Sequence, residues 1–281
     1  MALLDRLRSA TPLVGVELRP PRLGQEDAES MSSWIEMYGS VRRLAQRDTV
    51  LFLTDSAVGS REEENLQHLV ANLEDDVPRE RICPFLTTKH TLEYCLWYGI
   101  RATDAGYPAL VVLGGDEHVG PPRCVQHGWM LRRKLRDRCP RLTLGGWANP
   151  FRDASRQVDY LVDRSYTGEF YLTQVGSHYD LAPVDLFLEE ARRRDVTMPG
   201  LFGVFYYRSA SPKTLERLSK FIPVPAKQLT RDFQDRGLTA DEICARTIAA
   251  LRGIGATRVY VSNLPTDEAA ERLDAIMAMV A

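Results

Sequence analysis

The sequence predicts an α/β protein that folds as a single (β/α)8 TIM-barrel domain over residues 1–281. Three observations predict it: eight short β-rich runs, a stretch of helical period after most of them, and the near absence of charge within several runs. Parallel strands covered by helices show this pattern because both faces of each strand are buried. An open doubly wound sheet is the competing fold. It usually has fewer strands and often a glycine-rich phosphate turn, and the chain has neither G-x-G-x-x-G after its first run nor a Walker A sequence.

Alternation between strand-like and helix-like segments gives the expected elements in order. The strands are expected at Leu13–Leu18, Thr49–Thr54, Ile82–Leu86, Ala109–Gly114, Leu142–Trp147, Glu169–Gln174, Gly200–Tyr207 and Arg258–Asn263. Helices are expected at Ala28–Gln46, Arg61–Leu73, Leu92–Ala105, Val125–Arg138, Ala154–Tyr166, Val184–Arg194 and Asp267–Met279. The long segment 208–257 should hold three more helices, and Thr239 with Glu242 has the spacing of a helix-capping pair.

Composition excludes several classes of function. The net charge is −2 with no strongly basic region, so we expect no nucleic-acid partner. No apolar run approaches the length of about 18 residues that spans a membrane, and residues 1–10 form a short helix in place of a signal peptide. Five scattered cysteines without C-x-x-C, and histidines without ligand spacing, predict a cytoplasmic protein with neither disulfides nor metal. The chain ends soon after the last expected helix, so we expect no regulatory domain.

The active site of such a barrel lies at the C-terminal ends of its strands. One polar residue there is more often a satisfied loop residue, but a whole set converging from different strands predicts a site. The candidates are Glu17, Thr54, Asp55, Thr87, Asp116, Trp147, Asn149, Gln174, Tyr206 and Tyr207.

Two carboxylates stand out among these candidates. Glu17 lies between Val16 and Leu18, and desolvation favours the protonated form of a carboxyl, which can then donate a proton near neutral pH. Asp116 follows two glycines and is better placed to stay ionised and stabilise positive charge. Because no G-x-S-x-G nucleophile motif occurs, the expected chemistry is proton donation or hydride transfer stabilised by a carboxylate.

Short motifs at the strand ends resemble those of the methylenetetrahydrofolate reductases, in the same order along nearly the whole chain. They are VGVELRPPR at Val14–Arg22, Thr54, LTT at Leu86–Thr88, VVLGGD at Val111–Asp116, YLTQ at Tyr171–Gln174, MPGLFGV at Met198–Val204 and VYVSNL at Val259–Leu264. Each motif is short and unspecific, and their shared order and spacing carry the resemblance.

That family reduces 5,10-methylenetetrahydrofolate to 5-methyltetrahydrofolate with NAD(P)H, in one-carbon metabolism and methionine biosynthesis. The resemblance implies that Glu17 protonates N10 of the folate, so that the ring opens to an N5-iminium cation, and that Asp116 stabilises this cation. It also implies folate binding by Gln174, which would hydrogen-bond the pterin. The other expected substrate-binding residues are Thr54, Asp55 and Tyr206. The expected cofactor-binding residues are Thr87, Trp147, Asn149 and Tyr207.

Departures from the family pattern concern its flavin. Phe85 stands where the family has His, Gly114 replaces an Arg, and Trp147–Asn149 with Phe151 replaces a Tyr-Pro-Glu segment followed by His. An acidic residue within 162–164 falls where the family has a basic cluster, although a flavin diphosphate requires cations. We therefore expect weak or absent FAD binding and direct hydride transfer from NADH or NADPH.

Two other functions remain open from the sequence. One is a folate-binding barrel without reductase activity, although a binder has no need for a general acid at Glu17. The other is a flavin-dependent barrel dehydrogenase of another kind, such as a proline-dehydrogenase-like enzyme.

Overall fold

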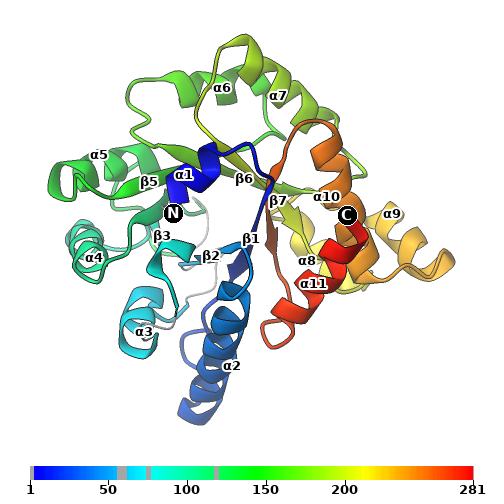
Figure 1. The fold of residues 1–281 in the computed structure, drawn as a ribbon, viewed down its shortest axis with the longest axis horizontal. Helices are drawn as coiled ribbons and strands as arrows, with labels where there is room; N and C mark the ends of the chain where they lie inside the picture. The colour runs from blue at the N-terminus through cyan, green and yellow to red at the C-terminus, as the bar shows by residue number, and fades with distance from the viewer. Residues whose placement is uncertain (1–2, 56–61, 74–76, 117–119, 281) are drawn as a thin grey trace.

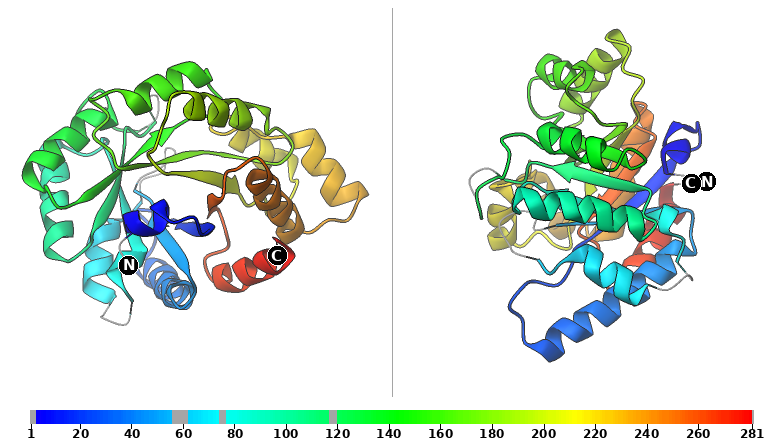
Figure 2. Two further views of the ribbon diagram at one scale, coloured as in Figure 1. Left: turned by 45° about the horizontal axis from the view of Figure 1, so that its top comes forward. Right: turned by 90° about the vertical axis from the view of Figure 1, so that its left-hand side faces the viewer.

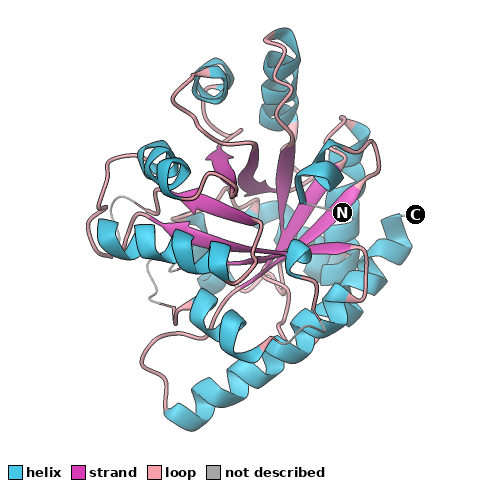
Figure 3. Ribbon diagram, turned by 60° about the vertical axis from the view of Figure 1, so that its left-hand side comes forward, coloured by secondary structure: helices cyan, strands magenta, loops and turns pink. Residues whose placement is uncertain are grey.

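The computed structural model describes residues 3–55, 62–73, 77–116 and 120–280. Eight parallel strands form a closed barrel in chain order, in which β8 pairs with β1 (Figure 1). Helices surround the strands on the outside (Figure 3). The predicted single-domain (β/α)8 barrel is confirmed.

The strands coincide closely with the predicted runs. They are β1 (Leu13–Leu18), β2 (Thr49–Leu53), β3 (Ile82–Thr87), β4 (Ala109–Leu113), β5 (Thr143–Ala148), β6 (Phe170–Gly176), β7 (Gly200–Phe205) and β8 (Arg258–Ser262). The largest differences are at β6, which runs two residues further than expected, and at β7, which ends two residues earlier. A register shift between Leu172 and Val175 accompanies the longer β6.

Helices follow the strands as the periodicity predicts. They are α1 (Leu3–Arg8), α2 (Asp27–Ala45), α3 (Asn65–Asn72), α4 (Leu92–Asp104), α5 (Gly128–Arg138), α6 (Ala154–Val162), α7 (Ala182–Arg193), α8 (Pro212–Ser219), α9 (Ala226–Thr230), α10 (Ala240–Gly253) and α11 (Ala269–Val280). Short turns of other helix types occur at η2 (Arg79–Arg81) and η3 (Arg231–Asp235). The third helix was expected from Arg61, which lies outside the described residues; residues 62–64 are not helical, and α3 begins at Asn65. Thr239 and Glu242 form the expected capping box of α10.

Alternation along each strand divides the core into two layers. Val14, Val16 and Leu18 of β1 belong to the large layer between sheet and helices. Leu13 of the same strand belongs to the barrel interior, together with residues such as Phe52 and Tyr260. Gly15 leaves room for this interior, because a Cβ there would come within 2.7 Å of the Phe52 ring. The alternation places Glu17 on the inner side, above this aromatic layer.

The two ends of the barrel are closed differently. Helix α1 covers the N-terminal end, where Leu3 and Leu7 are fully buried against the interior layer. The segment between β7 and β8, with α8 and α9, lies on the opposite side of the molecule from α1 (right panel of Figure 2). From that segment Ile222 reaches the interior layer and packs against it. The C-terminal strand ends, called the mouth below, therefore lie beneath an additional helical segment.

Candidate active site

The mouth has a polar half and an apolar half. Inward-facing polar residues end β1, β2, β3 and β8, namely Glu17, Thr54, Thr87 and Ser262. Inward-facing apolar residues on the other side pack on the interior layer, namely Leu113, Trp147, Phe205 and Ile222. A barrel mouth with this division suits a flat, mostly apolar ring system that carries polar groups along one edge.

Glu17 occupies the polar half beside strand β8. Its Oε1 accepts a hydrogen bond of 2.7 Å from the Ser262 hydroxyl, its register partner on β8. Burial raises the pKa of the Glu17 carboxyl, the Ser262 hydrogen bond and the charge of Arg19 lower it, and the net result is a raised pKa. Within the described residues no cation is hydrogen-bonded to Glu17. The structure thus provides the physical basis for a protonated carboxyl at the mouth.

Glu62, at the end of the β2–α3 connection, is a buried carboxylate that the strand-end rule did not identify. Its Oε1 accepts from Nε of Arg19 at 3.0 Å, and its Oε2 accepts from the Thr54 hydroxyl at 2.8 Å. Burial raises the pKa of Glu62, Arg19 and Thr54 act in the opposite direction, and the net pKa is raised. Glu62 holds the predicted residue Thr54 in place and contributes negative charge that further raises the pKa of Glu17.

Asp55 forms a third carboxylate centre with Thr87 and His90. Its Oδ2 accepts from the Thr87 backbone N–H at 2.7 Å and from the Thr87 hydroxyl at 3.1 Å. Nε2 of His90 lies 2.7 Å from the Asp55 Oδ1. Burial lowers the pKa of His90, but the hydrogen bond and charge of Asp55 outweigh it and the net pKa is raised. The two predicted residues Asp55 and Thr87 are therefore brought together, and His90 joins them.

Asp116 follows the end of β4 by three residues, and β4 is the third strand from β1 around the ring of eight. The residue before it, Gly115, has φ of 70°, and a Cβ there would meet the Lys89 side chain at 2.8 Å. A glycine is therefore favoured at position 115 for two reasons: its positive φ, and the Lys89 side chain that leaves no room for a Cβ. The Asp116 side chain is partly buried at this position.

Arg123 brings a positive charge to the end of β4. Its guanidinium donates to the Gly115 carbonyl at 2.6 Å, and its Cζ would lie 3.4 Å from a Cβ on Gly114. A cation from the following loop therefore occupies the space that a side chain at Gly114 would need. The missing strand-four arginine does not leave this edge without positive charge.

Gln174 is inward-facing but its amide is engaged within the protein. Its Nε2 donates to the Phe221 carbonyl at 3.1 Å, and its Oε1 accepts from the Val175 backbone at 3.0 Å. This contact ties the segment that carries Ile222 to the end of β6. Gln174 therefore lies near the mouth with one amide N–H and one position on its carbonyl oxygen already engaged within the protein.

Two other predicted residues, Tyr206 and Tyr207, pack away from the interior layer of the barrel. Tyr206 faces the helices and donates to Asp241 of α10 at 2.7 Å, because Phe205 takes the last inward position of β7. Tyr207 packs in a separate cluster and donates to the Pro223 carbonyl at 3.3 Å. Asn149 organises the start of the β5–α6 loop, where its Oδ1 accepts from the Phe151 N–H at 3.0 Å.

The described residues contain no group of three or more His, Cys, Asp or Glu side chains that could hold a metal ion. Among those residues there is also no helix of the length and hydropathy that crossing a membrane requires.

No protein-family model matches the chain, and no curated protein matches it. Among solved structures, one that is similar is an uncharacterized protein from Clostridium thermocellum that binds two copies of 5-methyl-5,6,7,8-tetrahydrofolic acid. The two superimpose with a TM-score of 0.69 at 15% identity, over 99% of this chain and 98% of that chain. QR15, an aldolase, gives a TM-score of 0.47 at 10% identity, over 95% and 96% of the two chains. At these identities the first likeness shows a shared fold, and the second is too distant to argue from.

Proposed function

We propose that this chain is a folate-binding barrel that reduces 5,10-methylenetetrahydrofolate to 5-methyltetrahydrofolate with NADH or NADPH. The observation that carries the proposal is the environment of Glu17, a carboxyl whose pKa is raised by burial and whose hydrogen-bond partner is a neutral hydroxyl. A carboxyl of this kind is suited to donate a proton. The resemblance of the strand-end motifs to those of the methylenetetrahydrofolate reductases supports this role, because the Glu of the corresponding first-strand motif is that family's general acid.

Two further observations support a folate as the ligand. The mouth combines an apolar half, which includes Trp147 and Phe205, with a polar half around Glu17. A pterin has flat faces and polar edges, so it fits this division. The similarly folded Clostridium thermocellum protein binds 5-methyltetrahydrofolic acid, which is the product of the proposed reaction.

The proposed reaction begins with proton transfer from Glu17 to N10 of the folate. The N10–methylene bond breaks, its electron pair stays on N10, and an N5-iminium cation forms. Asp116 stabilises that cation by its negative charge. A hydride from the nicotinamide co-substrate then adds to the iminium carbon, which becomes the N5-methyl group. Glu17 is left ionised and recovers its proton from water.

We propose that no flavin takes part in this transfer. Phe85, at one position where the family has a polar flavin contact, is buried in the interior layer of the barrel. At the end of α6, where a diphosphate would need a cation, the Asp163 carboxylate accepts from the Ser165 N–H at 2.7 Å. Hydrogen bonds from the side chain and the backbone of Ser165 lower the pKa of Asp163, which favours its charged form. Arg123 supplies a cation at the β4 end, but these other positions do not fit a flavin diphosphate.

Turnover by colourless protein tests this proposal. The purified chain should show no absorbance near 450 nm and should oxidise NADH or NADPH only when methylenetetrahydrofolate is present. Absence of turnover with both nucleotides would reject the reductase, and folate binding in the same preparation would then identify a folate-binding barrel. A yellow protein that is bleached by NADH would show that the hydride passes through a flavin.

A further inference from the structure

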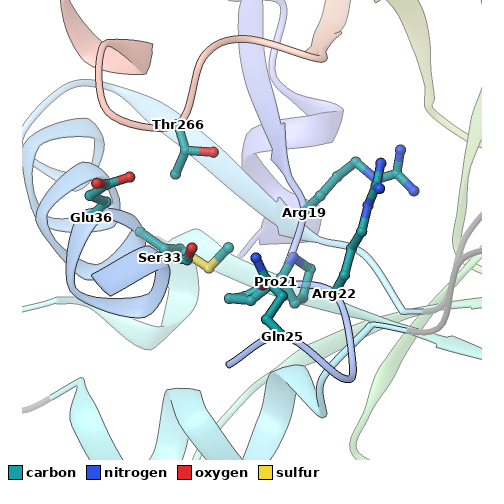
Figure 4. Close-up of a pocket in the computed structure, with 9 residues that line it drawn as sticks. Arg19, Pro21, Arg22, Gln25, Ser33, Glu36 and Thr266 are labelled. Atoms are coloured by element: carbon teal, nitrogen blue, oxygen red, sulfur yellow. The ribbon is translucent and has the colours of Figure 1, made fainter. Parts of the chain in front are cut away.

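A pocket of about 310 Å³ lies beside the mouth, between the β1–α2 loop, helix α2 and the β8–α11 loop (Figure 4). The residues that line it are Arg19, Pro20, Pro21, Arg22, Gln25, Ser33, Glu36, Met37 and Thr266. Arg19 connects this pocket to the candidate active site, because it follows Glu17 by two residues on the same strand end. Arg19 is thus shared between the two places: it lines the pocket, and it pairs with Glu62, which accepts a hydrogen bond from Thr54 at the mouth.

The polar groups of the pocket are distributed unequally. Arg19 and Arg22 lie side by side at one end, and Glu36 lies at the other (Figure 4). The Arg19 guanidinium is already paired with Glu62 at 2.9 Å. Arg22 is exposed and forms no ion pair with any residue in the described ranges. At the arginine end, Arg22 is therefore the cation offered to a ligand anion. Arg19 beside it is a second cation, held by its ion pair with Glu62.

Gln25 adds an acceptor between the two ends. It lines the pocket, and its side-chain Oε1 is buried without a hydrogen-bond partner. Buried polar atoms are normally paired, so an unpaired one in the wall of a pocket points to a missing donor. The pocket thus combines an acceptor for an N–H group with a cation for a carboxylate.

We propose that this pocket binds the acyl-glutamate tail of the folate, with the tail carboxylate on Arg22 and its amide N–H on Gln25. The inference rests on the proposed function and assigns a place to the part of the substrate that does not react. Glu36 repels carboxylates from the far end, so the tail charges stay at the arginine end, where further glutamates extend into solvent. Binding energy from this distant contact helps to hold the reacting ring at Glu17.

Titration calorimetry with two ligands tests the assignment. One ligand is 5-methyltetrahydrofolate, and the other is 5-methyltetrahydropteroate, which lacks the glutamate. The full-length chain should bind the first at least roughly tenfold more tightly, as expected for one charge-assisted hydrogen bond. In Arg22→Ala this preference should disappear, through weaker folate binding and unchanged pteroate binding. Arg138→Ala, at an exposed position at the end of α5, is the matched control and should keep the preference.

The outcomes separate this inference from the function on which it rests. Equal binding of the two ligands by the wild-type chain, or an equal loss for both ligands in Arg22→Ala, overturns the tail pocket and leaves the folate site intact. Failure of the wild-type chain to bind either ligand overturns both the tail pocket and the folate function.

Discussion

Three buried or half-buried carboxyls meet at the polar half of the mouth, and their partners give them different roles. Asp55 is bonded to His90, and Glu62 is bonded to Arg19, so each has a positively charged or protonatable partner. Glu17 is bonded to the hydroxyl of Ser262. A neutral donor compensates a buried negative charge less than a cation does, which favours the protonated form of Glu17. Proton donation is therefore assigned to Glu17 among the three.

A stability measurement tests the raised pKa of Glu17 directly. A carboxyl whose folded pKa exceeds the unfolded value of about 4.3 stabilises the fold fully below that pH, and this contribution is lost as pH rises through the folded pKa. Glu17→Gln removes the ionisation, so it should raise the stability at pH 8 by on the order of 1 kcal/mol and have little effect at pH 4. Thermal melts at both pH values, with the exposed Glu189→Gln as control, measure the difference. A larger gain at pH 4 than at pH 8 would contradict the raised pKa.

The hydrogen bond from Ser262 should set the pH range of activity. It lowers the pKa of Glu17, so Ser262→Ala should raise that pKa further. Since the reaction needs protonated Glu17, the alkaline decline of kcat should move to higher pH in the variant. An unchanged or more acidic decline would show that Glu17 is not the proton donor.

At the scale of elements, the strands were predicted well because they carry their own signal. Runs such as LVGVEL of β1 are apolar on both faces, and that property depends on local sequence alone. The end of β7 was less predictable, because GVFYY continues the β-rich composition after the strand pairing stops. Strand pairing depends on the neighbouring strands, and the local composition of one segment gives no information about them.

The same limit explains why some predicted site residues are oriented differently from the expectation. Tyr206 was expected at the mouth, yet Phe205 takes the inward position, and the alternation turns Tyr206 toward α10. Glu62 and His90 were missed because they lie in loops, where residue type alone does not predict direction. Their signal was their chemical type next to a strand end: His90 follows Thr87 by three residues, and Glu62 ends a loop rich in acids.

Helix α1 offers a test of the element that closes the barrel's N-terminal end. Leu7 is fully buried against the interior layer, so Leu7→Ala should reduce the free energy of unfolding by about 2–5 kcal/mol through lost burial and a cavity. Urea unfolding followed by circular dichroism gives the value. Leu23→Ala, at a position with 58% exposure, should change it little. A loss below about 0.5 kcal/mol in Leu7→Ala would show that α1 does not contribute to the core.

At the scale of the whole molecule, the barrel separates proton chemistry from ring binding. Strands β1, β2, β3 and β8 supply the carboxyls and hydroxyls, while the opposite strands and the segment before α9 supply Leu113, Trp147, Phe205 and Ile222. The hydrogen bond between Gln174 and Phe221 joins strand β6 to the segment that carries Ile222. A ring bound between the halves would have one edge near Glu17 and its faces against apolar groups.

The most direct test of the account is the rate of methylenetetrahydrofolate reduction by Glu17→Gln, measured together with its affinity for 5-methyltetrahydrofolate. Loss of a general acid typically lowers a rate by about 10²–10⁴-fold, and the amide keeps the size of the side chain. The account predicts a loss of this order in kcat, with folate affinity within a few-fold of the wild-type chain. Reduction by Glu17→Gln at the wild-type rate would contradict it.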